Sequence, residues 1–306
     1  MYEKFYNFKE KPFSVTPDTK YFYASEKHEE ALSSLLYAIQ ERRGFVVITG
    51  EIGSGKTTSW RVLINRLDRT TKIALILNTH LTPKQMLMAI LEEFEVSFKD
   101  TWTKVKMLSM LNRFLLEQIS MGINVVLIID EAQNLTKSTL EEVRMLSNLE
   151  TEKEKLIQII LMGQPELREK LACKSLEQLR QRIQVSYHLL PLSRDETRSY
   201  IEYRLRVAGI QSGMLFSKNT FDKIYEYTGG VPRLINTLCD RALLNGFVQE
   251  KAQIDEDIIE ESAMEIEGVR KEIMRESSNS EDSNIQEILK RVYGKFSKEP
   301  IKVDSK

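Results

Sequence analysis

The sequence predicts an α/β fold, in which a parallel five-stranded sheet carries helices on both faces and is followed by a small all-helical domain. Continuous apolar runs, typical of parallel strands covered on both faces, alternate with helical segments in the first two thirds of the chain. Such alternation indicates a parallel sheet. After Pro191 the apolar runs stop and the pattern becomes helical throughout, which predicts a second domain.

Five apolar runs are expected as strands, namely residues 45–49, 73–77, 125–129, 156–162 and 185–189. Between them, Thr82-Pro83 supplies an N-cap and a first helical residue, a helix is expected from about Thr103 to Met121, and Ser138–Glu141 predicts a capping box. Ligands of parallel sheets bind beyond the carboxyl ends of the strands. The residues that follow these runs are therefore the candidates for a site.

The first run leads into Gly50–Thr57, which matches G-x-x-x-x-G-K-[ST] and continues as a helix to about Leu67. Between a strand and a helix, this pattern indicates a phosphate loop that binds a nucleoside triphosphate, because backbone N–H groups and the helix dipole favour phosphate there. Lys56 is expected to bridge the β- and γ-phosphates, and Thr57 to bind Mg²⁺. The candidate nucleotide-binding residues are Gly50, Glu51, Ile52, Gly53, Ser54, Gly55, Lys56, Thr57 and Thr58.

Two acids, Asp130 and Glu131, follow the run 125–129. An acid at such a strand end can hold the Mg²⁺ shell, and a second acid beside it can polarise an attacking water. Asp130 is thus a candidate metal ligand and Glu131 a candidate catalytic residue. The alternative is that both acids only begin the next helix, where acidic side chains are favourable.

Polar residues in three later segments are further candidates. Gln164 follows the fourth run and could reach the γ-phosphate or the lytic water, or could merely cap the next helix. Arg180 and Arg182 precede the fifth run, and one of them could act on the nucleotide of a neighbouring subunit or belong to a solvated helix face. Arg233 follows Pro232 and could fold over the γ-phosphate or lie on the surface.

We expect four domains or segments along the chain. Residues 1–44 precede the first strand and include the first helix of the ATPase domain, and 45–191 form its α/β core. Residues 192–268 form a helical domain that begins with the capping box Ser193–Glu196, and 269–306 a charged tail. The expected helices are 194–208, 218–227, 232–249 and 256–267, with a short amphipathic helix at 285–296 in the tail.

Composition restricts the classes of function. With 44 basic and 45 acidic residues the net charge is −1, so no global field attracts nucleic acid or membrane. Two cysteines without metal spacing suit a reducing compartment. No apolar run reaches 18 residues and no signal pattern opens the chain. We therefore expect no integral membrane segment and a cytoplasmic location, with recruitment to the inner membrane through a partner as an alternative.

Several segments together resemble the AAA+ ATPases and, among them, the ExeA/GspA family of secretion-associated ATPases. The resemblance runs from residue 1 to about 268, and its segments include Lys11-Pro12-Phe13-Ser14, Thr16-Pro17-Asp18, Tyr21-Phe22-Tyr23, His28–Leu32, Asp130–Leu135, Gly163–Leu167, Leu179–Arg182 and Gly229–Arg233.

The resemblance implies an AAA+ core with a helical lid, ATP and Mg²⁺ as ligands, and assembly of identical chains into a ring or filament. It assigns Gln164 to the sensor-1 position, Arg182 to the arginine finger with Arg180 as the alternative, and Arg233 to sensor 2. It also implies that Pro17 and the N-terminal aromatic residues line the adenine side. The residues alone favour the simpler interpretation that Phe5, Phe8 and Phe13 are core anchors.

The leading hypothesis is an ATPase that drives assembly of a secretion or surface-structure complex through a protein partner. Because the chain stops at Lys306 without the membrane span and periplasmic domain that such family members often carry, we expect no direct coupling to the cell wall. The alternative is an ATP-dependent regulator of the TnsC/TniB transposition type that binds duplex DNA, which the near-zero net charge disfavours. A monomeric ATP-binding switch is a third hypothesis.

Overall fold

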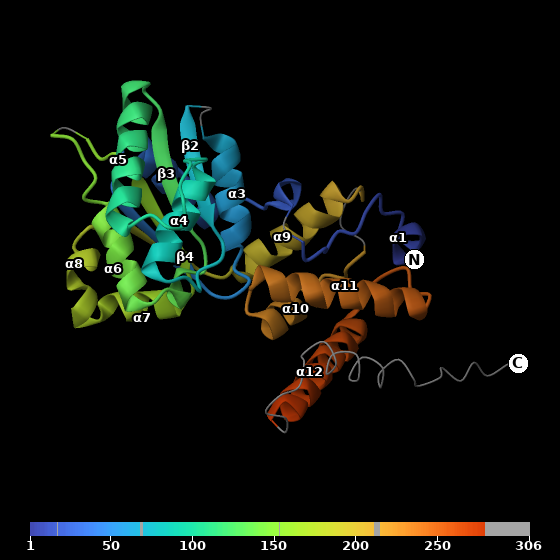
Figure 1. The fold of residues 1–306 in the computed structure, drawn as a ribbon. Helices are drawn as coiled ribbons and strands as arrows, with labels where there is room; N and C mark the ends of the chain where they lie inside the picture. Colours follow the sequence, from blue (N-terminus) through green and yellow to red (C-terminus); the bar gives the residue numbers. More distant parts are fainter. Residues whose placement is uncertain (17, 68–69, 153, 211–214, 279–306) are drawn as a thin grey trace, which may run out of the picture. The chain divides into compact units, whose positions relative to one another are not determined.

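The computed structural model describes residues 1–16, 18–67, 70–152, 154–210 and 215–278 (Figure 1). These residues form two compact units, each considered by itself. The α/β unit comprises Thr16–Leu192 together with Val231–Arg233, and the helical unit comprises Met1–Val15, Ser193–Gly230 and the chain from Leu234 onward. No helix in the described part of the chain is long and apolar enough to cross a membrane.

The α/β unit is built on five parallel strands in the order β2-β3-β4-β1-β5, which confirms the predicted sheet. β1 lies between β4 and β5, so the loop that follows it emerges within the sheet and not at an edge. The strands are β1 Phe45–Gly50, β2 Thr71–Ile76, β3 Asn124–Ile129, β4 Gln158–Gly163 and β5 Ile183–Leu189.

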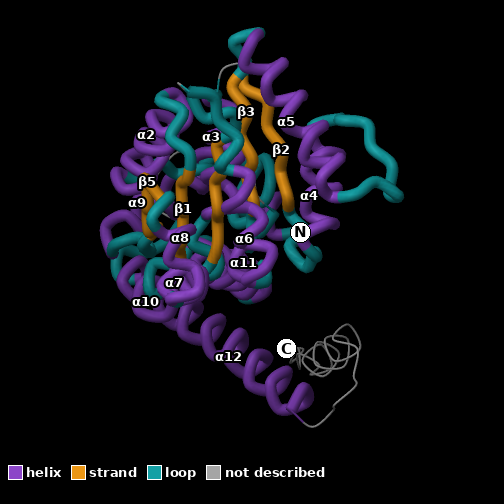
Figure 2. Tube along the Cα trace, turned by 60° about the vertical axis from the view of Figure 1, so that its left-hand side comes forward, coloured by secondary structure: helices purple, strands orange, loops and turns teal. Residues whose placement is uncertain are grey.

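Helices cover both faces of this sheet (Figure 2). Apolar side chains of α2 and α3 pack with alternate residues of β1, β3 and β4 on one face, and those of α4 to α8 pack with the other set of strand residues. The helices are α2 Glu26–Gln40, α3 Lys56–Arg66, α4 Pro83–Glu93, α5 Lys104–Ser120, α6 Lys137–Leu146, α7 Pro165–Ala172 and α8 Glu177–Arg180.

The structure confirms the predicted starts of two helices and moves the predicted start of a third. Thr82 caps α4 with Gln85 completing the capping box, and Ser193 caps α9 with Glu196. The expected box at Ser138–Glu141 is wrong, because α6 begins at Lys137 with Thr136 as its N-cap. The Thr136 hydroxyl is a stronger choice since it accepts from the Thr139 backbone N–H at 3.1 Å and contacts the Thr139 hydroxyl at 2.8 Å.

The end of β4 leaves no room for a side chain at Gly163. A Cβ there would lie 2.7 Å from Gln133 Oε1 and 2.9 Å from Leu167 Cδ2. We expect Gly163→Ala to lower the free energy of unfolding by about 1–3 kcal/mol, the usual cost of overpacking. Gly44→Ala is a matched control, because its Cβ would meet nothing closer than 3.7 Å. Urea denaturation of both variants measures the difference, and equal stabilities would contradict the expectation.

The helical unit contains α1 Tyr2–Phe5, α9 Arg194–Val207, α10 Thr220–Thr228, the greater part of α11 Pro232–Val248, and α12 Glu256–Ser278. Met1–Val15 belong to this unit, which corrects the expected division at residue 44. The reason is a set of contacts distant in sequence. The buried Arg204 guanidinium donates to the backbone oxygens of Pro12 (2.6 Å) and Ser14 (3.1 Å), and Tyr6 Oη donates to the Lys251 carbonyl (3.0 Å).

Three N-terminal aromatic residues, Phe5, Phe8 and Phe13, are parts of this unit's packing. Phe13 is 1% exposed and meets Phe216 edge-on, and Phe8 is also buried. Phe5 is partly exposed and stacks edge-on against Phe247. This packing fits the interpretation of Phe5, Phe8 and Phe13 as core anchors, and their expected adenine-side role stays a prediction.

The backbone of α12 continues as a helix to Ser278, where a charged tail was expected from residue 269. Its sequence from Gly268 to Ser278 contains five charged helix formers and no proline, which is compatible with helix continuation. Pro17 and the expected helix 285–296 lie outside the described residues.

Candidate nucleotide site

The phosphate-loop segment turns sharply between β1 and α3. Gly53 and Gly55 have φ angles of +81° and +95°, a left-handed region that glycine enters without strain, and Gly55 is the N-cap of α3. A Cβ at Gly50 would lie 2.8 Å from both the Leu189 carbonyl oxygen and Ser54 Oγ. The loop is thus shaped by glycines where a backbone must approach a ligand closely, as the sequence pattern predicts.

Lys56 lies at the start of α3 with its side chain folded back on this loop. Its ammonium group donates to the carbonyl oxygens of Gly50 (2.7 Å) and Glu51 (2.9 Å). Burial lowers the pKa of Lys56, and the carboxylates of Glu131 and Asp130 oppose that shift. A buried ammonium group that faces two carboxylates is positioned to exchange the loop carbonyls for phosphate oxygens.

Thr57 and Asp130 meet at the carboxyl ends of β1 and β3. Thr57 Oγ1 donates to Asp130 Oδ2 at 3.4 Å, and Asp130 Oδ1 accepts from the Glu131 backbone N–H at 2.9 Å. Burial raises the pKa of Asp130, partly offset by that N–H bond. A hydroxyl and a carboxylate are oxygen ligands of the kind that Mg²⁺ takes beside substrate phosphates. This donor pair fits the predicted metal.

Glu131 is held by a network that joins the ends of β3 and β4. Its Oε2 accepts from Gln133 Nε2 and, at 3.1 Å, from Gln164 Nε2. Gln133 Oε1 in turn accepts from the Gln164 backbone N–H at 3.1 Å. Glu131 itself has a φ of +51°, which non-glycine residues rarely adopt and which is a recurring feature of active sites. The network fixes the direction of the Glu131 carboxylate.

Two findings in this network bear on the predicted residues. Gln164 is the N-cap of α7 but its side chain makes no cap bond and turns to Glu131 instead. Gln133 was given no role from the sequence, although it stands two residues after Glu131. It lies in the segment Asp130–Leu135 of the family resemblance, which assigns it no role. Its contacts with Gly163 and Gln164 appear only in the folded structure.

Arg233 reaches the phosphate loop through its backbone. Within the α/β unit, its N–H donates to the Gly53 carbonyl at 3.2 Å, and a Cβ at Gly53 would lie 2.4 Å from the Arg233 Cβ. The Arg233 side chain is exposed. Of the other predicted loop residues, Ile52 is 59% exposed and Thr58 is half-buried on α3.

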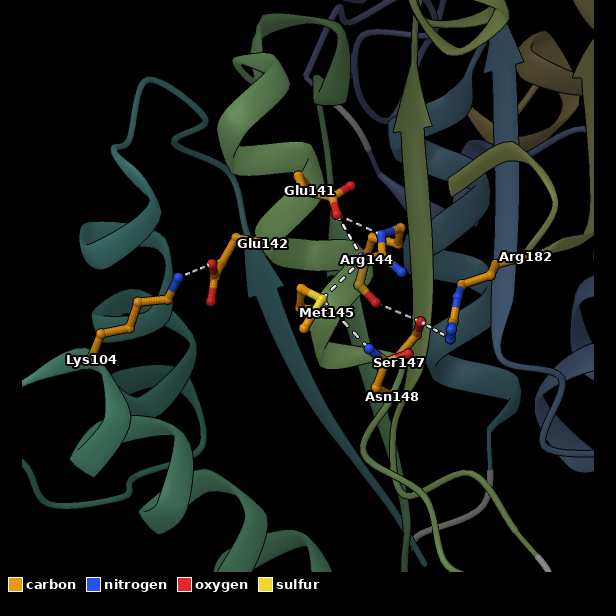
Figure 3. Close-up of polar contacts among 8 residues, drawn as sticks. All are labelled: Lys104, Glu141, Glu142, Arg144, Met145, Ser147, Asn148 and Arg182. Carbon is orange, nitrogen blue, oxygen red and sulfur yellow. Dashed lines mark hydrogen bonds and ion pairs between the residues drawn. The ribbon is translucent and has the colours of Figure 1, made fainter. Parts of the chain in front are cut away.

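The two remaining candidates, Arg180 and Arg182, lie at the opposite end of the strands, just before β5 begins. Figure 3 shows Arg182 there. Arg182 is half-buried in a cleft of about 610 Å³, and its Nη1 donates to Ser147 Oγ at 2.9 Å. Arg180 is exposed and donates to the Ala172 carbonyl at 3.3 Å. The structure therefore brings Lys56, Thr57, Asp130, Glu131, Gln164 and Arg233 to one edge, and leaves both arginines at the other.

Comparison with known proteins agrees with this geometry. Residues 39–171 match the family model described as an AAA domain. The chain is 43% identical over 273 residues to general secretion pathway protein A of Aeromonas hydrophila. The match covers 89% of this chain and 50% of that protein, so the chain spans about half the length of this curated relative.

Among solved structures, Cdc6p from Pyrobaculum aerophilum is similar with a TM-score of 0.62 at 17% identity, covering 94% of this chain and 85% of that one. The ORC1 protein of Aeropyrum pernix in complex with DNA has a TM-score of 0.61 at 18% identity, over 95% and 82% of the two chains. The RuvB Holliday junction branch migration motor of Thermotoga maritima has a TM-score of 0.54 at 20% identity, over 88% and 82%. These identities bear on the fold alone.

The order of the strands and the phosphate loop with its acidic partners agree with the AAA domain match. The likeness to general secretion pathway protein A agrees with it as well. The chain belongs to the AAA+ P-loop family, with general secretion pathway protein A as its curated relative.

Proposed function

We propose that the chain binds ATP with Mg²⁺ and hydrolyses ATP to ADP and phosphate. The single observation that carries this proposal is the Glu131 carboxylate, held by Gln133 and Gln164 beside the bonded pair of half-buried Thr57 and buried Asp130. A triphosphate on the loop would place its terminal phosphate between Lys56 and this carboxylate. The AAA domain match supports an ATPase of this kind.

The residues divide the chemistry among them. Thr57 and Asp130 would hold the Mg²⁺, which neutralises phosphate charge as it develops. Lys56 would place its positive charge on the phosphates, and Glu131 would orient the attacking water and accept its proton. Gln164 contacts the same carboxylate at 3.1 Å and is suited to sense whether the terminal phosphate is present.

Arg182 supports assembly into an oligomer, because it cannot reach the nucleotide of its own chain. The phosphate loop begins after Gly50, the last residue of β1. The cleft that contains Arg182 is lined by Phe45, the first residue of β1. Six residues at about 3.3 Å each separate the two by roughly 20 Å, far beyond an arginine side chain. We infer that Arg182 acts on the nucleotide of a neighbouring copy in a ring or filament.

We further propose that the ATP cycle serves the assembly or remodelling of a secretion or surface-structure complex, on the cytoplasmic side where ATP is supplied. The 43% identity to general secretion pathway protein A supports this role. The duplex-DNA alternative has no such support, since the DNA-bound neighbour shares only the fold at 18% identity.

The test is Glu131→Gln, which keeps the shape of the side chain and removes its charge. We expect ATP affinity close to wild type and turnover lower by about 10²-fold or more, the scale that general base catalysis contributes. Phosphate release and binding of a fluorescent ATP analogue measure the two quantities. Normal turnover in this variant would remove Glu131 from the mechanism. In cells, Glu131→Gln should block export even when the wild-type protein is also present, because oligomers that contain both chains would bind ATP without hydrolysing it at the normal rate.

A further inference from the structure

The cleft around Arg182 contains a serine, Ser147, whose hydroxyl accepts a hydrogen bond from the Arg182 guanidinium. The cleft lies where β1, β4 and β5 begin, and Gly44, Phe45, Arg144, Ser147, Lys155, Gln178, Gln181, Arg182 and Gln184 line it. Arg144 pairs with Glu141 and Lys155 with Glu150. The Arg182 guanidinium instead donates to the neutral hydroxyl of Ser147 (Figure 3).

The Ser147 hydroxyl has a fixed orientation. It donates to the Arg144 carbonyl at 2.7 Å and accepts from Arg182 Nη1 at 2.9 Å. Its proton therefore points to Arg144, and one lone pair of its oxygen points to Arg182. Ser147 is 2% exposed, and its own carbonyl accepts from Lys155 Nζ at 3.2 Å. Burial and these bonds hold the hydroxyl in one position beside the arginine.

We propose that Ser147 is a positioning residue, which holds the Arg182 guanidinium in the direction needed to reach the nucleotide of a neighbouring copy. A neutral acceptor orients the guanidinium and leaves its positive charge available, whereas a carboxylate in the same place would neutralise it. Positioning of this kind lowers the cost of ordering a long side chain at the moment of reaction. The proposal rests on the trans-acting role of Arg182.

The test compares Ser147→Ala with Ser120→Ala. Ser120 is a matched control, because it also ends a helix and donates to the carbonyl three residues earlier, at 2.7 Å, but lies exposed at the end of α5. We expect Ser147→Ala to lower kcat about tenfold in assembled protein with KM for ATP unchanged, and Ser120→Ala to leave both constants as in wild type. Ser147→Cys, similar in shape but a weak acceptor, should lower kcat in the same way.

The double variant Ser147→Ala with Arg182→Ala separates positioning from a general structural effect. If Ser147 acts through Arg182, the double variant turns over no more slowly than Arg182→Ala alone. Full additivity of the two losses would overturn the proposal, as would a normal kcat in Ser147→Ala and Ser147→Cys when Arg182→Ala is slow. Normal turnover in Arg182→Ala itself would instead refute the trans-acting role on which the proposal rests.

Discussion

Replacing Arg182 with alanine should reduce ATP turnover of the assembled protein by about 10³-fold, within the range that arginine fingers supply in other phosphoryl-transfer systems. The nucleotide affinity of each chain should not change, because the guanidinium lies at the far edge of the sheet from its own phosphate loop. Arg180→Ala is the control, since Arg180 is exposed and donates to the carbonyl of Ala172 at the end of α7. Phosphate release at saturating ATP measures both variants.

Mixing two inactive variants tests whether the arginine acts between copies. An Arg182→Ala chain retains a complete nucleotide site, and a Lys56→Ala chain retains its arginine. In mixed oligomers the second would serve the site of the first, so turnover should recover to a fraction of the wild-type rate. Turnover per chain should also rise with protein concentration in the wild type. Absence of both effects would show that Arg182 does not act in trans.

The parts of the site that the sequence predicts are those held in one short segment or at the end of one strand. The phosphate loop is contiguous, and its glycines show directly where positive φ angles are needed. Asp130 and Glu131 are found because an apolar run ends at them, and parallel strands end at a common edge. The sheet with its five strands follows from the same runs.

The parts that the sequence does not predict depend on contacts between distant segments. Gln133 acquires its role only where β3 and β4 end side by side. Ser147 looks like an ordinary residue after a helix until Arg182, 35 positions later, is seen to donate to it. The N-terminal fifteen residues join the helical unit because Arg204 bonds two of their carbonyls. No periodicity in the sequence reports such bonds.

Asp130→Asn should raise the stability of the protein without nucleotide while it lowers Mg²⁺-dependent turnover by about 10²-fold, since a metal contact contributes several kcal/mol to the transition state. The carboxyl is 5% exposed and burial raises its pKa. A raised folded pKa means that the native state binds this proton more tightly than the unfolded state, so the ionised group costs stability at higher pH. Asparagine removes that cost and its side-chain oxygen can keep the bond from the Glu131 N–H.

The pH dependence makes this expectation specific. Below the ordinary aspartate pKa of about 3.9 both states of the wild type hold the proton, and the two proteins should be equally stable as far as this group is concerned. As pH rises from there through the elevated folded pKa, the wild type should lose stability relative to Asp130→Asn, and the difference should then stay constant. Urea denaturation from pH 4 to pH 8 measures it. A difference that shrinks with rising pH would mean that Lys56, and not burial, governs the ionisation of Asp130, and that the acid is held charged by its partner before any metal binds.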